Sequence, residues 1–400
     1  MGGLNMAEGK TFITPREIVW GRGSLSHLEN IEGERAIIIT DKNMVKLGFV
    51  DKAKQHLKKA GLDVAVFDDV EPNPPITNVT KALEEHKEFS PDVIIGLGGG
   101  SPMDVSKVFR IFLEHPHLTF EGVRYFGGPP KTPVPPFKKT ISIGITATSG
   151  TASEVSWAGA ITDPTINVKC IVGSAFLIPT VAILDPDLAD SMPKVLQADT
   201  GLDALTHAIE AYTSVLGSDF TRTFAFQSTV LLMKYLVPAY VNNDKAAKEH
   251  VHYAASMAGC AFSNSGLGAD HVVATQVGGK FHLTHGRACA VVLPYTIKFN
   301  GEAAGELYTH IARATGYNGN DRDEAVNHLL QRVIEIQRQL EMPGSYSEVG
   351  IPKDQYLEEL QDMLDKSPSH PGTISNPRKY TIEELKRLYD ASYYGDYDLI

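Results

Sequence analysis

The sequence of 400 residues predicts an α/β domain followed by an all-helical domain. In the first half, short β-branched or apolar runs alternate with amphipathic helical stretches, which is typical of a parallel sheet flanked by helices. One of these apolar runs leads directly into three consecutive glycines. From about Met192 onward the apolar residues follow a helical period, and no parallel strand is predicted. We therefore expect one domain at residues 1–190 and another at residues 191–400.

The individual elements follow from the same patterns. Strands are predicted at residues 36–40, 64–67, 93–97, 140–145 and 180–184. Helices are predicted at residues 44–60, 77–89, 102–113, 195–212, 221–240 and 245–262. Residues 93–97 are continuously apolar, as expected for a strand that is covered on both faces. The segment from Phe12 to Trp20 resembles an extra edge strand that could pair across two subunits.

The composition excludes several classes of protein. With 42% hydrophobic and 21% charged residues, the chain can bury a large core. The net charge of −11 disfavours nucleic acid or an anionic membrane as the main partner, and no apolar run approaches the ~20 residues that span a bilayer. Three widely spaced cysteines (Cys170, Cys260 and Cys289) form neither a disulfide framework nor a zinc motif. We expect a cytoplasmic protein that binds neither nucleic acid nor a membrane.

Two loops are candidates for binding a nucleotide. Gly98–Ser101 joins a buried strand to a helix start, where glycines let the backbone approach an anion and the first helical amides point outward. A pyrophosphate is the natural ligand there, and a flexible turn is the alternative. The hydroxyl-rich loop at residues 146–151 could bind phosphate or a nicotinamide amide, although such loops are often only turns.

Asp41 ends the first predicted strand and could accept hydrogen bonds from ribose hydroxyls. Because a carboxylate there repels a 2′-phosphate, it favours NAD over NADP. The alternative, an N-cap of the following helix, is compatible with that role.

Four residues of the second half could hold a metal ion. Asp203 and His207 are spaced to share one face of a helix, and His271 and His285 lie fourteen residues apart in a glycine-rich stretch. Mixed oxygen and nitrogen donors suit Zn²⁺ or Fe²⁺. The alternative is ordinary core or capped histidines, and His282 is close enough to His285 to be mistaken for it.

Four motifs in this order resemble the iron-containing (group III) alcohol dehydrogenases. The first three are GGGSxxD at Gly98–Asp104, TSGTASEVS at Thr148–Ser156 and DALTHAIEAY at Asp203–Tyr212. The fourth is His271 followed, fourteen residues later, by His285 and Gly286. The chain looks most like the alcohol dehydrogenase half of bifunctional acetaldehyde/alcohol dehydrogenases. The resemblance implies a Rossmann-like N-terminal domain that binds NAD(H) and a helical C-terminal domain that binds one divalent metal, as in the dehydroquinate synthase-like fold.

The resemblance also assigns roles to individual residues. It implies metal ligation by Asp203, His207, His271 and His285. It implies cofactor contacts from Asp41, Gly98, Gly99, Ser101, Asp104, Thr148, Ser149, Thr151, Lys169 and Leu184. It implies a substrate pocket that includes Ser156, Phe262 and Thr275.

Thr275 departs from the family pattern. Many relatives carry a second histidine at this position, four residues after the third ligand, and a threonine cannot replace it as a base. We hypothesise a different proton route, through His282, a water or the cofactor ribose. We also hypothesise a pocket for a larger or more polar substrate, such as the anionic sulfoacetaldehyde, whose alcohol is isethionate.

The expected activity is hydride transfer between nicotinamide and a short-chain alcohol or aldehyde, with the metal acting as a Lewis acid. Two alternatives are a polyol enzyme similar to glycerol dehydrogenase and a non-catalytic relative that binds metal or nucleotide. Because relatives usually form at least dimers, we expect a homodimer or a larger homo-oligomer.

Overall fold

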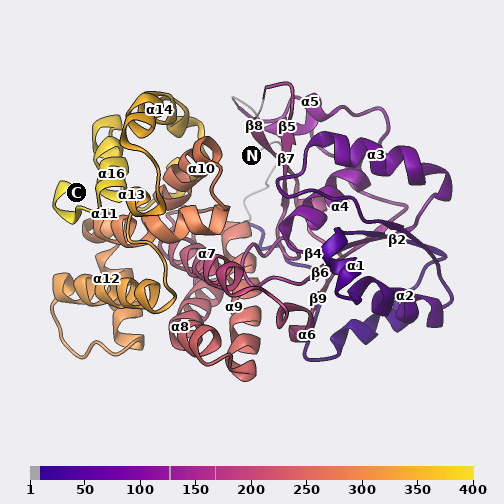
Figure 1. The fold of residues 1–400 in the computed structure, drawn as a ribbon, viewed down its shortest axis with the longest axis horizontal. Coiled ribbons are helices and arrows are strands. Elements are labelled where there is room, and N and C mark those ends of the chain that lie inside the picture. The colour runs from indigo at the N-terminus through magenta and orange to yellow at the C-terminus, as the bar shows by residue number, and fades with distance from the viewer. Residues whose placement is uncertain (1–9, 126–127, 167) are drawn as a thin grey trace. The chain divides into compact units, whose positions relative to one another are not determined.

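A computed structural model describes residues 10–125, 128–166 and 168–400 (Figure 1). The described residues form two compact units, one ending at Met192 and the other spanning Pro193–Ile400. The first unit is an α/β structure and the second is helical, so the predicted fold class is confirmed.

The first unit is built on a six-stranded parallel sheet with the order β1-β9-β6-β4-β2-β3. Its strands are β1 (Glu17–Trp20), β2 (Arg35–Ile39), β3 (Asp63–Phe67), β4 (Val93–Gly98), β6 (Ile141–Thr146) and β9 (Val181–Leu184). Five of them match the predicted strands to within one residue at the start of each. The segment expected as an edge strand supplies β1, which pairs with β9 of the same chain.

Helices cover both faces of this sheet, because alternate residues of each strand point to opposite sides. Ile38 and Ile95 pack with α2 in one core, whereas Ile37 and Ile94 pack with α3 and α4 in another. The helices are α1 (Lys42–Lys46), α2 (Phe49–Lys59), α3 (Ile76–His86), α4 (Gly100–Glu114), α5 (Phe120–Val123) and α6 (Pro186–Ala189). The helix predicted at residues 44–60 is divided because Gly48 adopts a left-handed φ of 76°.

A second, three-stranded antiparallel sheet was not predicted from the sequence. Its order is β5-β8-β7, and its strands are β5 (Arg124–Tyr125), β7 (Ala158–Asp163) and β8 (Val168–Gly173). β7 is composed mainly of small residues and alternates between buried and half-buried positions, so it lacks the strong apolar run of the central strands.

The second unit contains no strand within its described residues, 193–400. Its helices are α7 (Lys194–Thr213), α8 (Asp219–Val241), α9 (Lys245–Ser265), α10 (Ala269–Phe281), α11 (His285–Ala314), α12 (Arg322–Gln339), α13 (Tyr346–Val349), α14 (Lys353–Lys366), α15 (Gly372–Ser375) and α16 (Ile382–Tyr394). One core joins α7, α8, α9, α11 and α12, and another joins α10, α11, α14 and α16. α7 is buried along most of its length, so its polar residues need partners within the protein.

One helix in the described part of the chain, α8, is long and apolar enough to cross a membrane by length and composition alone. It contributes Leu232, Met233 and Leu236 to the first of these two cores. A core helix of a globular domain satisfies the same test, so this is weak evidence for a membrane span.

Candidate metal centre and nucleotide loops

Three helices of the second unit bring potential metal ligands together. We call this set the donor cluster: Asp203, His207, His271, His285 and Cys289. Asp203 and His207 lie one turn apart on α7, and His271 lies in the first turn of α10. His285 begins α11, and Cys289 follows one turn later. Three of the ligands implied by the resemblance, Asp203, His271 and His285, converge with Cys289, which was not predicted, and their ligand atoms all lie within 4.8 Å of one another. The fourth implied ligand, His207, lies beside this group and approaches Asp203.

The separations within the cluster suit a shared ion. The Oδ1 atom of Asp203 is 3.7 Å from Nε2 of His207 and 3.8 Å from Nε2 of His285. The Sγ atom of Cys289 is 3.8 Å from Nε2 of His271 and 3.7 Å from Nε2 of His285. The rings of His207 and His271 stack with their centroids 4.8 Å apart. Ligands bound at about 2.0–2.3 Å from one metal ion lie roughly 3–4 Å from each other.

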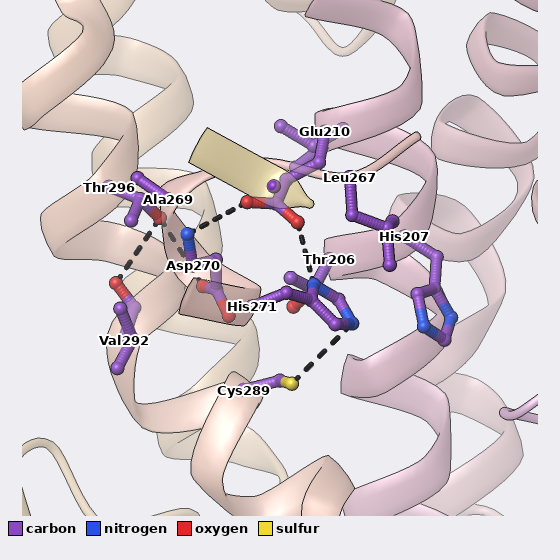
Figure 2. A network of polar contacts seen from close by, with 12 residues as sticks. Thr206, His207, Glu210, Leu267, Ala269, Asp270, His271, Cys289, Val292 and Thr296 are labelled. Atoms are coloured by element: carbon purple, nitrogen blue, oxygen red, sulfur yellow. Dashed lines mark hydrogen bonds and ion pairs between the residues drawn. The ribbon is translucent and has the colours of Figure 1, made fainter. Parts of the chain in front are cut away.

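Glu210 orients one of these histidines (Figure 2). It lies on α7, and its Oε2 accepts a hydrogen bond from Nδ1 of His271 over 2.6 Å, while Oε1 accepts one from the backbone N–H of Asp270 over 2.8 Å. His271 therefore presents an unprotonated Nε2 to the cluster, as in carboxylate–histidine–metal arrangements. Burial raises the pKa of Glu210 to about 7 and lowers the pKa of His271 well below its ordinary value.

Unsatisfied polar atoms show that the cluster fits a cation. Among the described residues, Oδ1 of Asp203 and Nδ1 of His207 are buried without a hydrogen-bond partner. Leaving a buried polar group unsatisfied costs about 1–3 kcal/mol, and coordination would remove that cost at Oδ1 of Asp203, the oxygen nearest Nε2 of His207 and of His285. A carboxylate with imidazoles suits a divalent transition metal. Burial, together with the charge of Asp203, raises the pKa of the Cys289 thiol well above its ordinary value.

The main chain holds α7 and α11 close together at the cluster. A Cβ atom on Gly286 would lie 2.4 Å from the carbonyl oxygen of Asp199, so the two backbones are in direct contact. The carboxylate of Asp199 also accepts hydrogen bonds from Oγ1 of Thr284 at 2.8 Å and Nε of Arg287 at 3.1 Å. These contacts fix the start of α11, where His285 lies.

The other predicted residues of this unit differ in their relation to the cluster. The Phe262 ring, on α9, lies with its centroid 4.5 Å from that of His207. Thr275 lies one turn beyond His271 on α10, and its Oγ1 is 3.4 Å from Nε2 of His370, a residue that the sequence did not indicate. His282 ends α10 in a left-handed conformation, and no contact among the described residues links its exposed side chain to the cluster.

In the first unit, the expected nucleotide loops meet at the carboxyl ends of three adjacent strands. Asp41 follows β2, Gly98 ends β4 and Thr148 follows β6. The backbone N–H of Ala147 donates to the Gly98 carbonyl over 2.8 Å, which joins two of the loops. This edge of a parallel sheet is where α/β proteins bind nucleotides.

The glycines permit close packing between these loops. Gly98 has a φ of +140°, and a Cβ atom there would lie 2.9 Å from Pro102 and 3.4 Å from the Asp41 carboxylate. A Cβ atom on Gly99 would lie 3.3 Å from Thr148. Ser101 lies in the first turn of α4, whose N-terminal amides carry the positive end of the helix dipole.

Asp41 is an N-cap, the alternative that the sequence offered beside ribose binding. Its Oδ1 caps α1 by accepting hydrogen bonds from the N–H groups of Asn43 at 2.8 Å and Met44 at 3.2 Å. Its Oδ2 is the atom that lies near Gly98.

Lys107, on α4, holds the loop that follows β6. The sequence did not indicate this role. Its buried Nζ donates to the Oγ and carbonyl of Ser156, to Oγ of Ser153 and to the Ala158 carbonyl. Ser153 in turn donates to Asp104 over 3.0 Å. Burial lowers the pKa of Lys107 to about 8 and raises that of Asp104. These contacts give Asp104 and Ser156 a structural function in the loop.

The remaining predicted cofactor residues lie on strands or in the loop that follows β6. Ser149 is buried, and the side chain of Thr151 faces Gly100. Leu184 is buried at the end of β9, beside Trp20 of β1. Lys169 lies exposed on β8, and its Nζ donates to Oδ1 of Asn73 over 3.2 Å. Among the described contacts, none joins Lys169 to the loops that contain Gly98 and Thr148.

The chain is similar to known proteins over most of its length. The family described as "Iron-containing alcohol dehydrogenase" matches residues 15–186, and "Fe-containing alcohol dehydrogenase family, C-terminal" matches residues 197–393. The NADPH-dependent butanol dehydrogenase of Clostridium saccharobutylicum is 39% identical over 96% of this chain and 98% of its own length. The bifunctional aldehyde-alcohol dehydrogenase of Escherichia coli (strain K12) is 36% identical over 95% of this chain, which spans 46% of that relative.

A solved structure extends the comparison to the fold. The iron-containing alcohol dehydrogenase from Thermococcus thioreducens superposes with a TM-score of 0.89 at 32% identity, covering 96% of this chain and 100% of that chain.

Proposed function

Because the chain belongs to the iron-containing alcohol dehydrogenase family, we propose that it interconverts short-chain aldehydes and alcohols with NAD(H). The observation that carries this proposal is the donor cluster, in which Glu210 orients His271 and the buried Oδ1 of Asp203 lacks a hydrogen-bond partner. A non-catalytic relative that binds metal or nucleotide would contain the same cluster, so turnover is the measurement that separates the two.

The residues of the chain have separable tasks. The family's cofactors supply a Lewis acid at the substrate oxygen and a hydride donor or acceptor at the substrate carbon. Asp203, His207, His271 and His285 would hold the metal, and Glu210 keeps the proton of His271 on Nδ1. Phe262 packs against His207 and forms an apolar wall beside it.

We propose NAD(H) as the preferred form of the cofactor. Asp41 places a carboxylate near Gly98, where it would bind ribose hydroxyls and repel a 2′-phosphate. The butanol dehydrogenase relative is NADPH-dependent, so the preference must be measured for this chain.

The proposed substrate is a short aldehyde with a polar or anionic substituent, such as sulfoacetaldehyde. Thr275 supports this because it offers a hydroxyl one helical turn from His271 of the cluster. The ligand set suits Fe²⁺ or Zn²⁺. We further propose a cytoplasmic homodimer or larger homo-oligomer, since β1 is a sheet edge with Trp20 exposed.

A reconstitution experiment tests the proposal. Metal-stripped protein is resupplied with Fe²⁺, Zn²⁺ or Mn²⁺, and NADH oxidation is followed with propanal, sulfoacetaldehyde and dihydroxyacetone. We expect metal-dependent turnover, fastest with sulfoacetaldehyde. Fastest turnover with dihydroxyacetone would support the polyol alternative, and NADH binding without turnover under any metal would contradict the enzymatic proposal.

A further inference from the structure

The segment that carries His370 is anchored against the start of α10. Oδ1 of Asn376 accepts a hydrogen bond from the N–H of Ala269 over 3.0 Å, and Asn376 exchanges two hydrogen bonds with Asn300. A Cβ atom on Gly372 would lie 2.5 Å from the Gly268 carbonyl oxygen, so the two backbones touch. His370 is therefore held in a defined position beside α10.

The hydrogen bonds of His370 determine which nitrogen carries its proton. Nδ1 accepts a hydrogen bond from the backbone N–H of Gly372 over 3.1 Å. A neutral imidazole has one N–H, so the hydrogen lies on Nε2. Nε2 is the atom 3.4 Å from Oγ1 of Thr275, and it donates to that oxygen.

The ring is neutral at physiological pH. Desolvation lowers the pKa of His370 to about 4, and the nearby charge of Glu210 opposes this shift only in part. His370 is thus a fixed donor to Thr275 and cannot accept a proton at Nδ1 while Gly372 occupies that atom.

The hydroxyl of Thr275 is directed away from its own helix. Thr206 and Thr213 donate to the carbonyls four residues before them on α7, as threonines in helices often do. Among the described contacts, Thr275 makes no such bond on α10. Because its oxygen accepts from His370, its own hydrogen remains available to a group beside it. Thr275 lies on the same face of α10 as His271, one turn away.

We propose that His370 is a positioning residue that makes the Thr275 hydroxyl a hydrogen-bond donor to the substrate. The pair then selects aldehydes whose substituent accepts a hydrogen bond, such as a sulfonate or hydroxyl oxygen, over plain alkyl aldehydes. This inference rests on the proposed function, because it concerns the substrate of the same site.

The test compares selectivity, defined as kcat/KM for sulfoacetaldehyde divided by kcat/KM for propanal. We expect Thr275→Val and His370→Leu each to lower this ratio by about 3- to 10-fold, the value of one hydrogen bond. Thr275→Ser retains the hydroxyl and should keep the ratio within about 2-fold. The double variant should have the same ratio as Thr275→Val, because both single changes remove the same interaction.

A second measurement needs no activity. Nitrogen-15 NMR of histidine-labelled, metal-free protein reports which ring nitrogen is protonated, and the His370 signals are identified by their loss in His370→Leu. We expect a protonated Nε2 whose shift changes in Thr275→Val. A protonated Nδ1 would overturn the proposal.

The outcomes separate the two proposals. Wild-type protein without metal-dependent turnover would refute the proposed function, whereas active protein in which His370→Leu leaves the selectivity unchanged would refute only the role of His370. Additive losses in the double variant would also refute it, since they would show that the two residues act independently.

Discussion

The carboxylate of Glu210 and the imidazole of His271 form a buried hydrogen bond of 2.6 Å between Oε2 and Nδ1. Glu210→Gln should weaken metal binding by about 10- to 100-fold, as changes beside metal ligands commonly do. The glutamine offers one oxygen where Glu210 accepts two hydrogen bonds, so either His271 or Asp270 loses its acceptor. Titration of Zn²⁺ against a chelator measures this, with the exposed Glu302→Gln as control. Equal affinities in the two variants would contradict the prediction.

The identity of the fourth ligand is open to a direct optical test. The ligand atom of Cys289 lies within 4.8 Å of those of Asp203, His271 and His285, whereas the resemblance assigns the fourth position to His207. A thiol must lose a proton to bind a metal ion, and an imidazole need not. We expect Co²⁺-substituted protein to show no sulfur-to-cobalt charge-transfer band, and Cys289→Ser to keep its metal affinity within about 3-fold. A band that disappears in Cys289→Ser would place the thiolate in the ligand set instead.

The choice between NADH and NADPH should depend on the charge of Asp41. Asp41→Asn keeps an oxygen to cap α1, because asparagine caps helices as well as aspartate does, but it removes the negative charge. We expect kcat/KM for NADPH relative to NADH to rise by about 10-fold, as repulsion of the 2′-phosphate disappears. An unchanged ratio, measured at equal ionic strength, would exclude Asp41 from the ribose site.

Gly98→Ala should impair NADH binding. Alanine rarely adopts a φ of +140°, and its Cβ atom would lie 2.9 Å from Pro102. The expected cost is about 1–3 kcal/mol of stability, with a loss of NADH affinity in fluorescence titrations. Gly61→Ala is the matched control, because its φ is also positive but nothing lies within 4 Å of the added atom. Comparable NADH affinity in both variants would argue against a cofactor role for the Gly98 loop.

The stability of the protein should fall in mild acid, partly through His370. Its native pKa of about 4 lies below its unfolded value of 6.5, so between these values the unfolded chain binds a proton that the native state excludes. This contribution is fully present above pH 6.5 and decreases as the pH falls to about 4, by up to about 3 kcal/mol. Urea unfolding from pH 4 to 7 should show a weaker pH dependence in His370→Gln than in the exposed control His117→Gln. Parallel curves would contradict the prediction.

Sequence patterns were sufficient for the features that depend on local order. The apolar run at residues 93–97 and the glycines after it predicted β4 and the turn into α4, and the spacing of Asp203 and His207 predicted their shared face on α7. The break at Gly48 and the small-residue strand β7 were missed, because neither changes the hydrophobic period strongly.

Residues that act through tertiary contacts could not be predicted in this way. His370 is 95 positions from Thr275, and no local pattern relates them. Lys107 reads as an ordinary helix residue until the loop at Ser153–Ala158 surrounds its ammonium group. Cys289 is the exception, since its spacing from His285 on one helix could have indicated it.

The backbone contact at Gly286 also limits which ions the cluster can accommodate. Because the carbonyl of Asp199 lies where a side chain would otherwise be, α7 and α11 can move neither closer together nor, while Arg287 and Thr284 hold Asp199, readily apart. The main chain therefore restrains the distance between the ligand atoms of Asp203 and His285. An ion that is too large or too small for this distance would bind off-centre, so discrimination among metals would arise from the main chain as much as from the ligands themselves.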